Sequence, residues 1–219
     1  EKGYCVFTLE IQPEEDLDTS TRLSSEISQN VLKACIKLRG SKDFKKTMDE
    51  VIEDVRIICK ASTCSVLLTD FKERTCSILT CARRQDMPPL DLDRVFNNEY
   101  IYIAESWIET LKGSNCLIIQ NDADMEIIRQ RNPDWYKSLT DACVKSIVLL
   151  PLTNNDEFIG FIWATNFDTS RALHIKETLE LVTFFIASEV ASYKLVQRLR
   201  FLSNEDLLTG VNNRNAMNN

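Results

Sequence analysis

The eight cysteines are the residues of this sequence with the greatest capacity for chemistry. Cys59 and Cys64 are five residues apart, and so are Cys76 and Cys81. If the strands that carry Cys64 and Cys81 pair in simple register, these thiols lie close together as a redox pair or a soft-metal site. However, the sequence contains no C-x-x-C, and a spacing of five is not a usual zinc pattern. Packing as small hydrophobes in a reduced core is therefore the favoured interpretation of the thiols.

The single histidine, His174, stands among charged residues near the start of an expected helix. It is either an axial haem ligand or a solvated helix residue, and the second interpretation is favoured. The acidic pair Asp122 and Asp124 is expected to cap the helix that follows it. These residues predict neither a catalytic site nor a metal site.

The composition indicates a folded, acidic protein. Of the 219 residues, 44% are hydrophobic and only 5 are Gly and 5 Pro, which supports a sizeable core. The net charge is −7 and no long Lys/Arg run is present, so nucleic acid is not expected as a partner. No apolar run is long enough for a bilayer, and no signal peptide opens the chain. We therefore expect a cytoplasmic protein with no membrane partner.

Alternating strands and amphipathic helices must position these residues. Strands are expected over residues 4–11, 63–70, 75–81, 116–120, 145–153 and 157–166. Helices are expected over 16–39, 42–60, 99–111, 122–143 and 171–205, the fourth of them divided at Asn132-Pro133. Turn residues predict two hairpins, one joining the second and third strands and one joining the last two. The last two strands are apolar on both faces, which favours a central position in a sheet covered on both sides.

The last helix carries two apolar stripes. One runs through Leu179, Val182, Ile186, Val190, Tyr193, Val196 and Leu199. The other has coiled-coil spacing and runs through Leu181, Phe185, Ser188, Ser192, Leu195, Leu199 and Leu202. At 1.5 Å per residue the helix would be roughly 45–50 Å long, longer than a small domain is wide. One stripe is expected to pack on the sheet and the other to meet a partner.

Two stretches carry a resemblance to a known family. Residues 121–139 predict a short helical pair, and "VKSIVLLPL" (144–152) is followed across a turn by "FIGFIWATNF" (158–167). This order resembles bacterial GAF domains and extends over about residues 41–190. The resemblance implies an α+β, PAS-related fold with a central antiparallel sheet covered by helices. Long N- and C-terminal signalling helices would flank it.

The final residues resemble a second family. "DLLTGVNNR" (206–214) is similar to the motif that opens GGDEF domains, the catalytic unit of diguanylate cyclases. The matching residues are Asp206, Leu208, Thr209, Gly210, Asn213 and Arg214. The resemblance implies that the chain is a fragment without catalytic residues, whose parent makes cyclic di-GMP from GTP with magnesium. A stalk helix that sets the geometry of a dimer would be the control element.

The N-terminal residues complete the expected domain order. "GYCVFTLEIQPEED" (3–16) is similar to the last strand and exit of a PAS domain. The expected order is a truncated PAS domain (1–15), a connecting helix (16–40), a GAF domain (41–190), a stalk (191–205) and the start of a GGDEF domain (206–219).

The resemblance to GAF domains implies a ligand pocket between the sheet and its helical insert. The candidates to line it are Trp107, Cys116, Ile118, Trp135, Tyr136, Trp163 and Asn166. Neither the bilin-attaching Cys-His pair nor the cyclic-nucleotide signature of the family is found, so the ligand is left unidentified. We expect no cofactor in the fragment and a homodimer formed through the terminal helices. A ligand-free dimerisation module and a cysteine-based redox sensor remain the alternatives.

Overall fold

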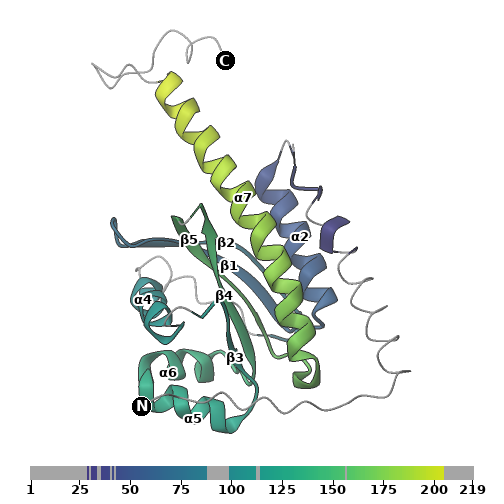
Figure 1. Cartoon of the computed structure of the whole chain (residues 1–219), viewed down its shortest axis with the longest axis vertical. Coiled ribbons are helices and arrows are strands. Elements are labelled where there is room, and N and C mark those ends of the chain that lie inside the picture. Colours follow the sequence, from purple (N-terminus) through teal and green to yellow (C-terminus); the bar gives the residue numbers. More distant parts are fainter. Residues whose placement is uncertain are drawn as a thin grey trace.

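The fold is a five-stranded antiparallel sheet with helices on both faces (Figure 1). The computed structural model describes residues 43–87, 99–111, 114–155 and 157–204, with the short pieces 29, 31–33, 36–39 and 41. The predicted strand at 4–11 and the GGDEF-like motif lie outside these residues, and the predicted connecting helix is covered only by the short pieces. Where it is described, the chain has the predicted α+β architecture.

The sheet has the order β2-β1-β5-β4-β3. Its strands are β1 (Thr63–Asp70), β2 (Thr75–Arg83), β3 (Leu117–Ile119), β4 (Ile147–Asn154) and β5 (Glu157–Thr165). The hairpins β1–β2 and β4–β5 confirm the predicted strand pairs. β5 lies between β1 and β4 and is a central strand, as its two apolar faces indicate.

Gly160 allows β5 to approach β1 closely. A Cβ atom at this position would lie 1.9 Å from the backbone carbonyl oxygen of Leu67, far inside van der Waals contact. Because that obstacle is backbone in the neighbouring strand, it cannot rotate away as a side chain could. The glycine therefore fixes the spacing of the two strands in the middle of the sheet.

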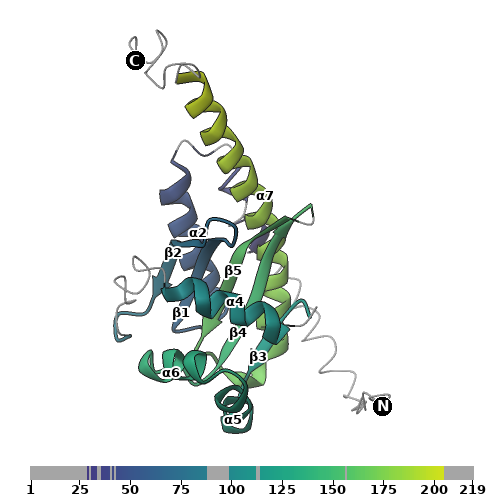
Figure 2. The same ribbon diagram turned by 90° about the vertical axis from the view of Figure 1, so that its left-hand side faces the viewer.

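Two long helices cover one face of the sheet, α2 (Phe44–Ile58) and α7 (Ala172–Asn204) (Figures 1 and 2). Met48, Val51 and Val55 of α2 pack in one apolar core with Leu179 and Val182 of α7. This core, which we call the filled face, holds 25 buried residues. Strand residues such as Cys64, Val66, Ile162 and Ala164 supply its floor.

Three short helices cover the opposite face, α4 (Glu99–Leu111), α5 (Asp122–Arg131) and α6 (Pro133–Asp141) (Figure 2). The break predicted at Asn132-Pro133 is confirmed, with Pro133 at the first position of α6 and Asn132 as its cap. The cap of α5 is Asn121, one residue before the predicted pair, and Asp124 instead accepts a hydrogen bond from the N–H of Gln120. α4 and α6 enclose a cavity against the sheet, so we call this side the cavity face.

The long helix extends past the sheet, as its length predicts (Figure 1). Val182, Ile186 and Val190 are buried, so the first stripe packs on the filled face up to that point. Beyond it, Tyr193 stacks on Phe44 of α2 with ring centroids 4.2 Å apart, and Leu199 is exposed. In the part of the chain that the structure describes, no helix is long and apolar enough to cross a membrane.

Candidate functional site

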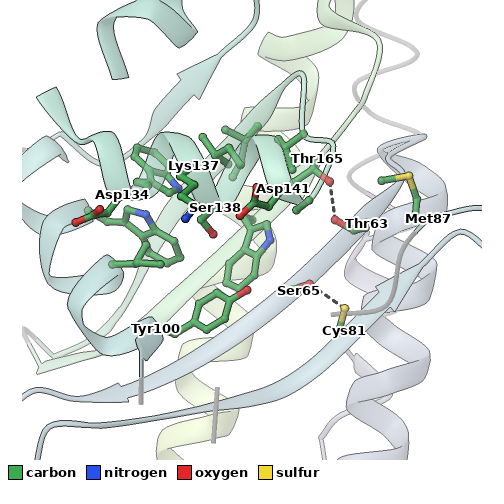
Figure 3. A pocket seen from close by; sticks show the side chains of 18 of the residues that line it. Thr63, Ser65, Cys81, Met87, Tyr100, Asp134, Lys137, Ser138, Asp141 and Thr165 are labelled. Atoms are coloured by element: carbon green, nitrogen blue, oxygen red, sulfur yellow. Dashed lines mark hydrogen bonds between the residues drawn. The ribbon is translucent and has the colours of Figure 1, made fainter. Parts of the chain in front are cut away.

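A cavity of about 740 Å³ lies between the sheet and helices α4 and α6 (Figure 3). Most of the residues around it come from β1, β2, β4 and β5 on the sheet side and from α4 and α6 on the helix side. Its volume is within the range of roughly 300–1,000 Å³ that is typical of small-molecule sites. Binding of a ligand is therefore what this face of the molecule is best suited to.

The floor of the cavity consists of two rows of side chains that run across the sheet. In one row, Cys81 lies opposite Ser65, and Ser65 lies opposite Trp163. In the other, which we call the polar row, Arg83 lies opposite Thr63, and Thr63 lies opposite Thr165. All six residues line the cavity. Because alternate residues of a strand point to the same face, the two rows are two residues apart on each strand.

Hydrogen bonds connect the side chains within each row (Figure 3). The hydroxyl oxygens of Thr63 and Thr165 are 2.6 Å apart, and either one can be the donor. The hydroxyl of Ser65 donates to Sγ of Cys81 over 3.2 Å. Arg83 donates from Nη1 to the carbonyl oxygen of Met87 over 2.8 Å, which holds its guanidinium beside the cavity. The floor is therefore an ordered array of polar groups.

Tryptophans form an aromatic wall between the floor and the helices. The ring of Trp107 makes edge contacts with three others, Trp135, Phe161 and Trp163, at centroid distances of 5.8, 4.8 and 5.7 Å. All four rings are at least nine-tenths buried. Such edge-to-face contacts add about 0.5–1.5 kcal/mol per pair to the burial of the rings. The wall is thus rigid and aromatic, and suited to a flat ligand. It includes one buried polar atom, Nε1 of Trp107, which has no hydrogen-bond partner among the described residues.

The mouth of the cavity carries charges of both signs. Lys137 of α6 lies between Asp134 and Asp141, at the spacings that allow ion pairs along a helix. Among the described residues, Lys137 forms an ion pair with neither aspartate, and no ion pair involves Arg83. These charges are therefore available to a polar ligand.

Polar contacts attach the short helices to the rest of the domain. The side-chain amide of Asn132 donates to the hydroxyl of Ser106 over 2.6 Å, which joins the α5–α6 junction to α4. Arg74, in the turn directly before β2, pairs with Glu105 of α4 over 3.1 Å and lies over the ring of Tyr102. Both contacts are made at the middle of α4, at Glu105 and Ser106, next to Trp107 of the aromatic wall.

Three of the seven predicted pocket residues line the cavity, namely Trp107, Trp135 and Trp163. Tyr136 packs against the core of the cavity face without lining the cavity. The prediction put Cys116 and Ile118 on the wrong face of the sheet, because both pack against the filled face. Their neighbours Leu117 and Ile119 face the cavity side. The two-residue period groups Cys116 with Ile118 correctly but does not say which face they occupy.

Asn166 has a structural role next to the cavity. Its φ of 52° is in the left-handed region, which asparagine tolerates better than most residues. Its side chain accepts from the N–H of Lys145 over 2.7 Å and donates to the carbonyl of Cys143 over 2.9 Å. The amide that was expected to hold a ligand therefore ties the start of β4 to the end of β5.

Sequence reasoning missed the polar row, whose members are far apart in the sequence.

The cysteines are separated by the sheet. Cys64 lies opposite Ala82 rather than Cys81 and packs in the filled face, while Cys81 faces the cavity. The predicted proximity of Cys64 and Cys81 on one face is therefore wrong, because the register differs by one residue from the simple one. Burial raises the pKa of Cys59 to about 12 and that of Cys116 to about 11, and it also raises the pKa of Cys64. Deprotonated, nucleophilic thiols are disfavoured at these three positions.

His174 lies in the first turns of α7, half-buried and away from the cavity. Its Nδ1 is 3.7 Å from a carboxylate oxygen of Glu177, one turn further along the helix. Among the described residues, no group of three or more His, Cys, Asp or Glu side chains has the arrangement of a metal site.

Comparisons with known proteins agree with this architecture. The family model of the GAF domain matches residues 43–191, and the chain belongs to this family. No curated protein matches the sequence. The match detects a regulatory domain and not a catalytic one, so the described chain is a sensory or regulatory module of the kind found in signalling proteins.

Solved structures share the fold at low sequence identity. The phycocyanobilin-bound GAF domain from a cyanobacterial phytochrome is 14% identical with a TM-score of 0.54, over 78% of this chain and 96% of that one. The GAF domain of a phosphoenolpyruvate-protein phosphotransferase from Coxiella burnetii is 11% identical with a TM-score of 0.54, over 78% and 98%. The GAF domain of a putative sensor histidine kinase from Pseudomonas syringae pv. tomato is 11% identical with a TM-score of 0.50, over 85% and 99%.

Proposed function

We propose that this chain is the ligand-sensing domain of a cytoplasmic signalling protein, and that it binds a small molecule in the cavity between the sheet, α4 and α6. The observation that carries the proposal is the difference between the two faces of the sheet. One face is filled by the long helices, and the other surrounds a cavity of ligand size. A module that only had to hold two helices would gain stability from filling that space.

The connection between the cavity and the long helices supports a relay. Thr165 of the cavity floor is followed by Asn166, and α7 begins six residues later at Ala172. Thr63 follows Ser62, whose N–H donates to the carbonyl of Thr165 over 2.8 Å, and α2 ends four residues before Ser62. A ligand that moved the Thr63–Thr165 pair would therefore act on the segments that follow the end of α2 and precede the start of α7. α7 is the proposed output of the domain.

A homodimer formed along α7 is part of the proposal. Phe184, Leu195, Val196 and Leu199 are exposed by between 45% and 72% of their surface, which is unusual for large apolar residues on one helix. The same observation favours the alternative of a ligand-free dimerisation module. The redox alternative has no such support, because Cys64 and Cys81 occupy different faces.

The downstream partner is proposed from the sequence alone. Residues 206–214 resemble the opening of GGDEF domains, so we propose that the parent protein is a bacterial diguanylate cyclase that uses two GTP and magnesium. In that case α7 would set the spacing of two cyclase domains. Assay of the full-length protein with GTP and magnesium tests this assignment, and no cyclic di-GMP under any state of the sensor would contradict it.

Native mass spectrometry of the purified chain tests the sensor proposal directly. A dimer with additional mass is expected, and the mass would identify the ligand. Ser138, which lines the cavity from α6, provides a matched variant, because Ser138→Trp should remove the additional mass and leave the dimer. A dimer that never carries additional mass, and whose stability no small molecule raises, would favour the dimerisation module. A monomer would remove the support for pairing along α7.

A further inference from the structure

We infer that the polar row is the recognition site of the cavity, and that it takes the anionic group of an aromatic ligand such as an aromatic carboxylate. The inference rests on the proposed function, because it specifies which chemistry the cavity selects. In it, Arg83 supplies the charge, Thr63 and Thr165 supply a hydroxyl donor, and the aromatic wall holds the body of the ligand.

The hydroxyl pair has a donor to spare. Thr63 and Thr165 carry two hydroxyl protons between them, and their mutual hydrogen bond uses one. Neither hydroxyl makes another side-chain hydrogen bond to the described residues. The second proton is therefore available to an acceptor in the cavity, beside Arg83 in the same row.

The charge of Arg83 is also uncommitted. A guanidinium has five N–H donors, and here one nitrogen donates to the carbonyl of Met87. The adjacent Arg84 is different, because its Nε and Nη2 bind both carboxylate oxygens of Asp86 at 2.5 and 2.9 Å. Arg84 does not line the cavity, whereas Arg83 does. The protein thus neutralises one of two neighbouring arginines and presents the other to the cavity.

The charges across the cavity give an anion one preferred direction. The α6 side carries Asp134, Asp141 and Lys137, so its two aspartates and one lysine sum to one net negative charge. Arg83 is on the sheet side, at the end of β2. An anion is repelled at α6 and attracted at β2, so the charged end of the ligand would point to the polar row.

The row next to the polar row, which contains Trp163, indicates that the body of the ligand is aromatic. Trp163 is two residues before Thr165 on β5, so its indole stands on the same face next to the hydroxyl pair. Trp107 and Trp135 continue this wall toward the helices. A flat apolar body would stack there while its anionic group reached the polar row, and a bidentate contact with guanidinium would fix its orientation.

Two fluorescent probes with the same body test the inference on the full 219-residue chain. Anilinonaphthalene sulfonate is an aromatic anion, and phenylnaphthylamine is the same ring system without the sulfonate. Titration of both probes is compared in the wild type, in Arg83→Gln and in the double variant Thr63→Val/Thr165→Val. The control is Arg84→Gln, which removes an equal charge one residue away and outside the cavity.

Arg83→Gln is expected to weaken the anionic probe by about tenfold or more, because a charge-assisted hydrogen bond is lost. The hydroxyl double variant should weaken it by about threefold to tenfold, while the neutral probe changes by less than about twofold in every variant. Arg84→Gln should change neither probe. Equal effects of Arg83→Gln on both probes, or none on either, would overturn the inference and leave the sensor proposal intact.

Ser138→Trp separates the inference from the proposed function. The indole would occupy the cavity, so both probes should lose binding if they bind there. If Ser138→Trp leaves both affinities unchanged, the probes bind elsewhere, and both the inference and the cavity proposal fail. Circular dichroism and the thermal midpoint of each variant confirm that the chain is folded.

Discussion

The same strands form two faces of the sheet that are packed differently. On the filled face, α2 and α7 bury long apolar stripes against residues such as Val66 and Ile162, most of which are fully buried. On the cavity face, the short helices pack around an aromatic wall and leave about 740 Å³ open above a polar floor. Dense apolar packing is thus concentrated on one side of the sheet, and open space lined by polar groups on the other.

This arrangement matters because β5 contributes to both faces. Ile162 and Ala164 point into the filled face, whereas Phe161, Trp163 and Thr165 point to the cavity side. In the proposed relay, a change that a ligand caused along the cavity floor would be carried by the strand that leads into α7. The difference between the faces can be tested with substitutions that act on one side only.

The largest effect is expected at the strand that serves both faces. Gly160→Ala places a Cβ 1.9 Å from the carbonyl oxygen of Leu67. We expect a loss of about 4 kcal/mol or more in the free energy of unfolding, above the usual cost of overpacking, because backbone must move. Urea denaturation followed by circular dichroism measures this loss. A cost below about 1 kcal/mol would show that the two strands are not held at this spacing.

The same substitution, leucine to alanine, can be made on each face to compare its cost in the free energy of unfolding. Leu179 of α7 is completely buried in the filled face, and Leu139 of α6 is 5% exposed and borders the cavity. Leu179→Ala should cost about 3–4 kcal/mol, and Leu139→Ala about 1–2 kcal/mol, because part of its surroundings is already empty. Equal losses in chemical denaturation would mean that the cavity face is packed as tightly as the other.

Added volume should also cost more on the filled face than on the cavity face. Val182→Phe enlarges a fully buried residue of the filled face, and we expect a loss of about 2–3 kcal/mol. Ile103→Phe adds volume next to the cavity, where the larger ring has room, so its effect should be within about 1 kcal/mol. Thermal unfolding of the two variants beside the wild type decides between these expectations, and a stronger effect at Ile103 would contradict the comparison.

The smallest perturbation is chemical labelling of the thiols. Burial raises the pKa of Cys59 to about 12, so only ~10⁻⁴ of this thiol is ionised at about pH 8. Cys59 and Cys64 of the filled face should resist iodoacetamide in the native protein, whereas Cys143, which is exposed, should react. Raising the pH toward the pKa should speed labelling of Cys59. Peptide mass spectrometry reads each position, and rapid labelling of Cys64 at about pH 8 would show that the filled face opens.

Much of the local structure could be predicted from the sequence. The helical period located α2 and α7, and the turn residues at 71–74 and 154–156 located both hairpins. The break before Pro133 was predictable because proline at the first helical position and a capping asparagine are local signals. The three tryptophans of the cavity could be proposed as pocket residues because the resemblance to GAF domains implies a pocket between the sheet and its helical insert.

What the sequence determined by itself is therefore local: the elements, their apolar stripes and the order that resembles GAF domains. The tertiary structure decided what depends on register and on the choice of face. A shift of one residue in the register of β1 and β2 separates Cys64 from Cys81. Cys116 lies on the filled face, where it packs against the core that includes the long helices. The polar row joins Thr63 to Thr165 across 102 residues of sequence, and periodicity within a strand carries no information about its partner. Long-range pairing, which local propensity does not encode, thus produced the site.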